Sequence, residues 1–258
     1  MIDTHCHLDF KDYNNRREDV ISTALDSGVH TIVNIGADKE STERSVQLAD
    51  RFDCVFATVG IHPHDAKTYD DNFADRLVQL AKHKKVKAIG EIGLDFYRDL
   101  SPRDIQRDVF HKQLDIAVQT NMPVVIHTRE SFKDTLDIVR NYANKIPGGI
   151  FHCFPGTVED AYDVIDLGFH ISVGGVITFP KAKMAEVAEN VPLEWILLET
   201  DSPYLTPVPF RGKTNHPAYV KYVCEKVAEL RNMSFAEVEK ITDRNAQKVY
   251  RLVEVFGE

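Results

Sequence analysis

The feature that most constrains the fold is a regular alternation of short apolar, β-branched runs with longer amphipathic stretches along the whole chain. Runs of the first kind predict buried strands, and apolar residues at three- and four-residue spacing predict helices. We expect strands at residues 2–5, 29–35, 55–59, 86–91, 123–127, 149–152, 169–173 and 195–199. Eight strands, each followed by a helix, are what a closed parallel barrel requires.

The pattern therefore predicts an α/β fold, a single (β/α)8 TIM barrel over residues 1–258 with extra C-terminal helices. The length of 258 residues is close to that of one such barrel. An open, doubly wound sheet is the alternative, because strands read from one sequence carry error. A Pro- and Gly-rich loop follows the last strand at 201–217, and helical stretches at 218–231 and 234–253 are expected to pack on the barrel exterior.

Two other helical stretches carry signals at their ends. In the stretch 102–121, Pro102 fits the first helical turn after Ser101, which we expect to be the N-cap. In the stretch 157–167, Thr157 is the expected N-cap, acidic residues follow in the first turn, and Gly168 comes at the end.

Charge and hydropathy narrow the class of protein. The formal net charge of −9 argues against a protein that coats duplex nucleic acid through a broad basic surface. No apolar run approaches the roughly 20 residues that cross a bilayer, and the first residues lack a basic, apolar secretory signal. We expect a cytoplasmic protein that does not contact membranes, and the acidic surface is compatible with a monomer.

The four cysteines, at positions 6, 54, 153 and 224, form no CxxC pair, so we expect reduced thiols. Strand alternation would turn Cys6 and Cys153 away from the neighbouring histidines. We interpret both as small buried hydrophobic residues rather than as ligands.

Residues that can bind metal or carry protons gather at the predicted strand ends. The carboxyl ends of parallel barrel strands lie on one face, where side chains from different strands converge. The residues in question are His5, His7, His62, Glu91, His127, His152 and Asp201. The sequence therefore predicts one polar pocket built from positions about 200 residues apart.

The local patterns favour a metal site. Residues i and i+2 of a strand share a side, so His5 and His7 can hold one ion. A carboxylate after an apolar strand needs a partner or a metal, and Glu91 has two oxygens that can serve two ions. Asp95 is a second choice for that role, and Glu199 competes with Asp201 as the last carboxylate.

These residues resemble the TatD family of metal-dependent deoxyribonucleases, within the amidohydrolase superfamily. The resemblance runs from end to end and rests on HCH at 5–7, GIHP at 60–63, GEIGLD at 90–95, the strand-end histidines 127 and 152, ETDSP at 199–203 and RGKTNHP at 211–217. It implies a barrel in which one ion is held by His5, His7, Glu91 and Asp201. Glu91 would bridge to a second ion held by His127 and His152, and His62 would lie close to a substrate phosphate.

For catalysis, we expect two divalent ions to activate a water while Asp201 accepts its proton as general base. Glu91 would bridge the ions, and His62 would position the phosphate or protonate the leaving group. Four histidines and two carboxylates permit Zn, Mn or Ni, and the resemblance points to Mg or Mn as well.

The predicted mouth of the barrel carries cations and aromatic residues. Arg129 and Arg211 are expected to grip phosphates, and Asn215 belongs to the matching RGKTNHP segment and is expected at the substrate. Further cations are Arg98, Lys181, Lys183 and Lys213, and the aromatic residues that could stack on bases are Phe96, Tyr97, Phe154, Phe179, Tyr204 and Phe210.

The leading interpretation is a 3′–5′ exonuclease acting on single-stranded or frayed DNA ends. One alternative is a metal-dependent ester or amide hydrolase, such as an aminoacyl-tRNA deacylase, because the same activated water can attack a carbonyl. The other is a non-catalytic barrel whose metals are structural or absent.

Overall fold

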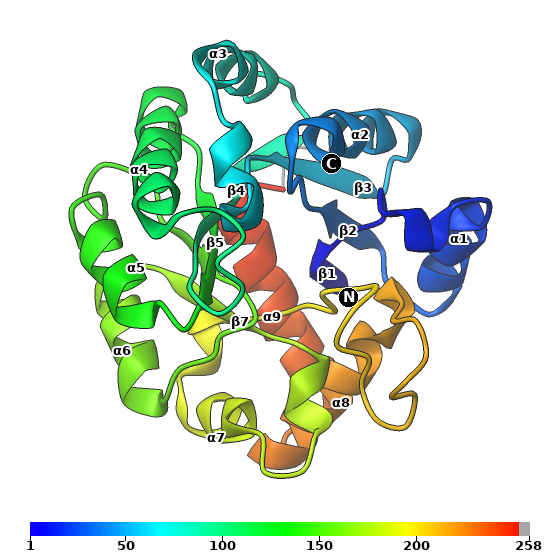
Figure 1. Ribbon diagram of the computed structural model, residues 1–258. Helices are drawn as coiled ribbons and strands as arrows, with labels where there is room; N and C mark the ends of the chain where they lie inside the picture. The colour runs from blue at the N-terminus through cyan, green and yellow to red at the C-terminus, as the bar shows by residue number, and fades with distance from the viewer. Residues whose placement is uncertain (253–258) are drawn as a thin grey trace.

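A computed structural model describes residues 1–252 and contains eight strands in one parallel sheet (Figure 1). The strands pair in chain order. They are β1 (Ile2–Cys6), β2 (Thr31–Asn34), β3 (Val55–Val59), β4 (Val86–Asp95), β5 (Val124–Arg129), β6 (Gly149–Phe151), β7 (His170–Val173) and β8 (Ile196–Leu198).

Helices surround these strands as a ring, which confirms the predicted (β/α)8 barrel rather than the open sheet (Figure 1). The α-helices are α1 (Arg17–Asp26), α2 (Lys39–Arg51), α3 (Asp71–Leu80), α4 (Arg103–Thr120), α5 (Phe132–Arg140), α6 (Val158–Asp166), α7 (Lys183–Asn190), α8 (Val220–Arg231) and α9 (Phe235–Tyr250). Short 3-10 helices are η1 (Lys11–Tyr13), η2 (Pro63–Thr68), η3 (Gly175–Thr178), η4 (Leu193–Trp195) and η5 (Pro217–Tyr219).

The loop after β8 closes the barrel against β1. Cys6 and Ser202 form an isolated parallel bridge. The Ser202 carbonyl accepts the His7 N–H at 2.8 Å, and the His5 carbonyl accepts the Asp201 N–H at 2.9 Å. The backbone that completes the barrel therefore also brings Asp201 beside His5, in β1, and His7, directly after it.

The barrel interior is apolar at its amino-terminal end and polar at its carboxyl-terminal end. Val125, Ile150 and Leu197 belong to a buried apolar cluster inside the barrel. Two residues further along each strand, the same side carries His127, His152 and Glu199. Because side chains alternate along a strand, this apolar layer lies directly beneath the polar residues and forms their floor.

Helix α9 differs from the prediction, which placed both C-terminal helices on the barrel exterior. Ala246 and Tyr250 belong to the apolar cluster inside the barrel, and the Tyr250 hydroxyl donates to the Thr4 carbonyl at 2.9 Å. In Figure 1, α9 crosses the centre of the ring of helices. It packs against β1 and β8, and Ala246 and Tyr250 cover the apolar cluster at the amino-terminal end of the barrel. Val253, the predicted end of this helix, lies outside the described residues.

Helix starts were predicted with mixed success. Thr157 caps α6 with a reciprocal capping box to Asp160, as expected. The N-cap of α4 is Pro102 rather than Ser101. The Ser101 hydroxyl is used elsewhere, since it donates to the His64 carbonyl at 2.8 Å. None of the helices in residues 1–252 is long and apolar enough to cross a membrane.

Candidate metal centre and its pocket

Strand β4 is built to carry Glu91 into the barrel. Its pairing with β5 shifts register between Ile89 and Ile92, and the strand continues to Asp95, beyond the predicted end at Glu91. Glycines allow the close approach. A Cβ at Gly90 would lie 2.7 Å from that of Val125, and one at Gly93 would lie 2.1 Å from the His127 carbonyl oxygen. Glu91 therefore projects from an irregular stretch in mid-strand rather than from a strand end.

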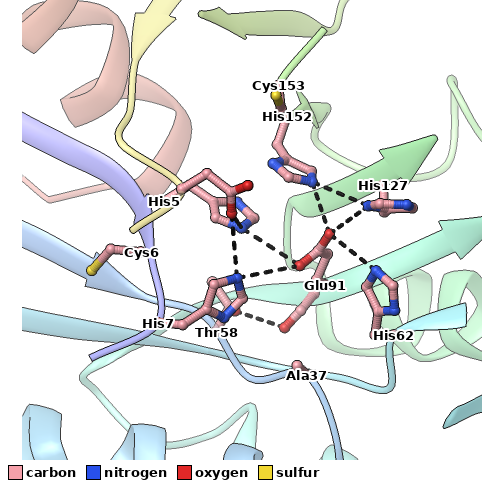
Figure 2. A network of polar contacts seen from close by, with 12 residues as sticks. His5, Cys6, His7, Ala37, Thr58, His62, Glu91, His127, His152 and Cys153 are labelled. Atoms are coloured by element: carbon pink, nitrogen blue, oxygen red, sulfur yellow. Dashed lines mark hydrogen bonds and ion pairs between the residues drawn. The ribbon is translucent and has the colours of Figure 1, made fainter. Parts of the chain in front are cut away.

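One oxygen of Glu91 faces the histidines of β1 (Figure 2). Oε2 lies 3.5 Å from His5 Nε2 and 3.9 Å from His7 Nε2. Asp201 Oδ1 lies 3.6 Å and 3.5 Å from the same two nitrogens. These separations are too long for good hydrogen bonds, and they surround a space that all four groups face. We call these four residues the β1 group.

The other oxygen of Glu91 faces three further histidines (Figure 2). Oε1 lies 2.8 Å from both His127 Nδ1 and His152 Nε2, and 3.5 Å from His62 Nε2. We call Glu91, His127 and His152 the β5–β6 group. Glu91 is thus shared by these two groups, and its role as a bridge between two ions stays a prediction.

One unsatisfied atom of the β1 group fits a cation. His5 Nε2, which faces Glu91 and Asp201, is buried without a hydrogen-bond partner. Buried polar atoms normally have partners, so such an orphan needs an explanation. Among the described residues, ligand atoms within 4.8 Å of one another form three overlapping groups: His5, His152 and Asp201; His5, His7 and Glu91; and His62, Glu91 and His127.

The electrostatics of the centre favour positive charge. Burial opposes ionisation of Glu91, but the charge on His152 and the hydrogen bond from His127 hold its pKa well below the usual range. Burial likewise opposes protonation of His152, but the carboxylates of Glu91 and Glu199 raise its pKa well above the usual range. The buried carboxylates are therefore stabilised by nearby positive charge, and divalent metal ions would supply such charge as well as the protonated histidines do.

His62 stands apart from the other histidines because of its backbone partner. It caps η2, and its Nδ1 accepts the His64 backbone N–H at 3.1 Å. Burial holds the pKa of His62 well below the usual range, so the ring is neutral. A neutral ring with an accepting Nδ1 carries its proton on Nε2, the nitrogen that faces Glu91. His62 therefore offers a donor to the pocket rather than a free lone pair for metal.

Asp95 and Glu199, which the sequence offered as competitors for ligand positions, lie behind two of the histidines instead. Asp95 Oδ2 is 3.1 Å from His127 Nε2 and also 3.0 Å from His64 Nε2. Glu199 Oε1 is 3.5 Å from His152 Nδ1, an ion-pair separation without hydrogen-bond alignment. His64 was not predicted at all, although its two-residue spacing from His62 was a readable signal.

A pocket of about 910 Å³ opens over these groups, and its lining includes His62, Glu91, Asp201 and Arg129. Six cations lie at or beyond the carboxyl ends of the strands, and none makes a salt bridge with any residue in the described part of the chain. They are Arg98, Arg129, Lys181, Lys183, Arg211 and Lys213, the set predicted for the mouth, and we call them the rim cations.

Two rim cations are stacked on aromatic rings. The guanidinium carbon of Arg129 lies 3.9 Å from the Tyr97 ring centroid, and that of Arg211 lies 4.1 Å from the Phe179 centroid. Stacking fixes each guanidinium plane while its N–H donors stay available to an anion.

Other predicted mouth residues are not available to a substrate. Asn215 is fully buried, and its side-chain amide donates to the carbonyls of Thr200 at 2.8 Å and Tyr204 at 2.5 Å. It holds the loop after β8 in shape instead of reaching the pocket. Of the six aromatic residues, Phe96 and Phe154 are buried, whereas Tyr97 and Tyr204 are 54% and 52% exposed.

The cysteines carry no disulfide in the described chain. Cys6 is fully buried in the larger of the two apolar clusters, as predicted. Cys153 is only half-buried and lines the pocket, which differs from the expectation of a buried hydrophobic residue. The reason is that β6 ends at Phe151, and Cys153 has a left-handed φ of 42° that strand alternation does not describe.

Known proteins similar to this chain cover its whole length. Residues 2–251 match the family model described as TatD related DNase. The uncharacterized metal-dependent hydrolase YabD of Bacillus subtilis is 41% identical, over 98% of this chain and 99% of its own. The 3′-5′ ssDNA/RNA exonuclease TatD of Citrobacter koseri is 33% identical, over 97% of this chain and 98% of its own.

Solved structures agree with these sequence matches. The TatD homologue YjjV of Escherichia coli K12 superposes with a TM-score of 0.91 at 30% identity, covering 97% of this chain and 98% of its own. A TatD-family hydrolase of Entamoeba histolytica has a TM-score of 0.86 at 21% identity, covering 97% of each chain, and shows the same fold.

Proposed function

Because this chain belongs to the TatD family and is a metal-dependent hydrolase, we propose that it is a deoxyribonuclease that removes nucleotides from single-stranded or frayed ends in the 3′–5′ direction. The observation that carries the proposal is the presence of ligand atoms on both sides of Glu91, at the base of a pocket that is lined by the rim cations Arg98, Arg129 and Lys183.

The ligand sets would hold two divalent ions. The β1 group would bind one ion and the β5–β6 group the other, with one oxygen of Glu91 serving each. Zn, Mn, Ni and Mg are all compatible with the imidazole and carboxylate donors. Such ions supply a nucleophilic water at neutral pH and neutralise charge on a phosphodiester.

Asp201 would then accept a proton, and His62 would position the substrate phosphate. Asp201 faces the pocket and would accept the proton of the attacking water as general base. His62 would donate its Nε2–H to a phosphate oxygen. Of the two roles predicted for His62, we propose this one, because a neutral imidazole is a good hydrogen-bond donor and a poor acid.

Two kinds of observation support a nucleic-acid end as the substrate. They are the distribution of charge around the pocket and the name of a similar protein. Six rim cations on a chain of net charge −9 concentrate positive potential at the pocket mouth rather than over a long surface. Exposed Tyr204, which lines the pocket, and Tyr97, which stacks on the lining residue Arg129, can stack on unpaired bases. The Citrobacter relative is named for 3′–5′ action on single-stranded DNA and RNA, which supports the same polarity here.

The test is an end-labelled assay. Purified protein is stripped with chelator and resupplied with Mg, Mn, Zn or Ni, then incubated with single-stranded DNA labelled at either end. We expect metal-dependent shortening from the 3′ end only, absent in Asp201→Asn and normal in Asp75→Asn, an exposed change on α3. No cleavage with any metal would overturn the nuclease proposal, and turnover of small esters instead would favour the ester or amide hydrolase.

A further inference from the structure

The two ligand sets differ in what stands behind their histidines. In the β5–β6 group, each histidine has a buried carboxylate at its outward nitrogen, Asp95 behind His127 and Glu199 behind His152. The Nδ1 of His152 makes no hydrogen bond, but Glu199 lies at ion-pair distance from it. In the β1 group, the outward Nδ1 atoms of His5 and His7 likewise make no hydrogen bond within residues 1–252, and the ion pairs of these two histidines run through Nε2 instead. The structure thus supports one set of ligands from behind and leaves the other unsupported.

Asp95 is held rigidly and uses both of its oxygens. Oδ1 accepts the backbone N–H groups of Tyr97 at 3.0 Å and Arg98 at 2.8 Å. Oδ2 faces the Nε2 atoms of His127 and His64. Gln106 brackets its backbone, accepting the Asp95 N–H at 2.8 Å and donating to its carbonyl at 3.1 Å. The carboxylate therefore cannot turn away from His127.

This contact decides which nitrogen of His127 can bind a cation. A carboxylate accepts but cannot donate, so the nitrogen that faces it must carry the proton. With its proton on Nε2, His127 presents Nδ1 to the pocket, 2.8 Å from Glu91 Oε1. Carboxylates that accept from a ligating histidine in this way fix its tautomer and raise its basicity.

Glu199 occupies the equivalent place behind His152. It is fully buried, and its Oε2 accepts the Ser172 hydroxyl at 2.5 Å while Oε1 accepts the Cys153 N–H at 2.8 Å. These bonds fix Oε1 at 3.5 Å from His152 Nδ1, which leaves Nε2 as the nitrogen that faces Glu91.

We propose that Asp95 and Glu199 are positioning residues that make the β5–β6 group the tighter of the two metal positions, so that the centre loads this position first and the β1 position second. The inference rests on the proposed two-ion centre but not on the choice of nucleic acid as substrate.

Asp95→Asn tests the proposal because it replaces one of the two accepting oxygens of the carboxylate by an NH2 group, which donates. The backbone N–H groups of Tyr97 and Arg98 can only donate, so they retain the amide oxygen. The amide NH2 then faces His127 and requires an accepting Nε2, which moves the proton to Nδ1. A protonated Nδ1 has no free lone pair and cannot bind metal. The wrong tautomer of a catalytic histidine is known to lower the activity of serine proteases in a comparable way.

The readout is metal binding without substrate. Metal-free protein is dialysed against buffers of graded free Mn²⁺, and bound Mn²⁺ is measured by elemental analysis. We expect two steps for the unaltered chain and a loss of about 10–100-fold in affinity of the tighter step in Asp95→Asn, with the weaker step unchanged. Glu199→Gln is expected to lower the affinity of the same step. The control Asp75→Asn is expected to change neither binding step.

The position is identified in an Asp201→Asn background, which removes a ligand of the β1 group alone. We expect one Mn²⁺ binding step to remain in Asp201→Asn, and we expect the Asp95→Asn change to lower the affinity of that same step. Unchanged affinity in both Asp95→Asn and Glu199→Gln, or equal weakening of both steps in variants with unaltered thermal unfolding, would overturn the proposal. Failure of DNA cleavage would leave this result untouched, so the two proposals fail separately.

Discussion

The tautomer of His62 follows from one backbone contact, because its Nδ1 accepts the His64 N–H at 3.1 Å. We predict that His62→Ala retains its bound metal but lowers kcat on single-stranded DNA by about 10²–10³-fold, the usual loss when one preorganised donor is removed. His62→Gln, whose amide can donate from a similar position, should recover part of the rate. The measurements are steady-state kinetics and elemental analysis, and loss of metal from His62→Ala would show that His62 is a ligand.

His170, at the start of β7, is remote from the predicted centre and contributes to the pH dependence of stability. Burial first, and then Lys248, lower its pKa from 6.5 to about 4. The folded protein therefore keeps this ring neutral while the unfolded chain protonates it below pH 6.5. Its stabilising contribution is complete above pH 6.5 and falls by about 3 kcal/mol as the pH drops through 4.

We predict that His170→Leu removes this part of the pH dependence. Denaturant unfolding at pH 7 and pH 4 can be followed by Trp195, the only tryptophan, whose ring centroid lies 4.8 Å from that of His170. The loss of unfolding free energy between the two pH values should be about 3 kcal/mol smaller in the variant. The same loss in both proteins would show that His170 is protonated without cost.

At the scale of single elements, β4 depends on glycine where it meets β5. Gly93 has φ +138°, and a Cβ there would lie 2.1 Å from the His127 carbonyl oxygen. We predict that Gly93→Ala lowers the free energy of unfolding by about 3 kcal/mol or more, from overlap added to backbone strain. Gly28→Ala is the control, since its φ is +88° with no atom within 4 Å, and should cost about 1 kcal/mol. Equal losses in urea unfolding would mean that β4 shifts to relieve the overlap.

The periodic pattern was sufficient to predict the strands, but not where a strand changes register. The limits of β3 were predicted correctly because Val55–Val59 is a simple apolar run. β4 continues to Asp95 through a register shift between Ile89 and Ile92. Alternation places residues 91 and 95 on the same side of a strand, so it indicates that both can face the interior but not that Asp95 lies behind His127. The position of helix α9 could not be predicted for a similar reason. Its apolar residues indicate that one face is buried, but they do not indicate which surface of the barrel that face covers.

At the scale of the whole molecule, the convergence of the candidate ligand residues was predictable because a parallel barrel brings all carboxyl strand ends to one face. Asn215 shows what that argument leaves out. It stands in the loop after β8, but its amide is consumed by backbone carbonyls that hold this loop. A residue's place at the mouth follows from topology, whereas its availability to substrate depends on hydrogen bonds that only the folded loop reveals.

The rim cations make a prediction that depends on the field of the whole mouth. If Arg129 and Arg211 contact phosphates, each lost contact should reduce the salt dependence of single-strand binding by about 0.7 in the slope of log K against log salt. In an Asp201→Asn background that prevents cleavage, the double change to Gln should lower the slope magnitude by about 1.4, measured by fluorescence anisotropy between about 50 and 200 mM salt. Arg76→Gln, which breaks a pair with Glu43 on the outer helices, should leave it unchanged. An unaltered slope in the double variant would mean that the phosphate path avoids both stacked arginines, and that the smaller substrates of an ester or amide hydrolase fit this pocket better.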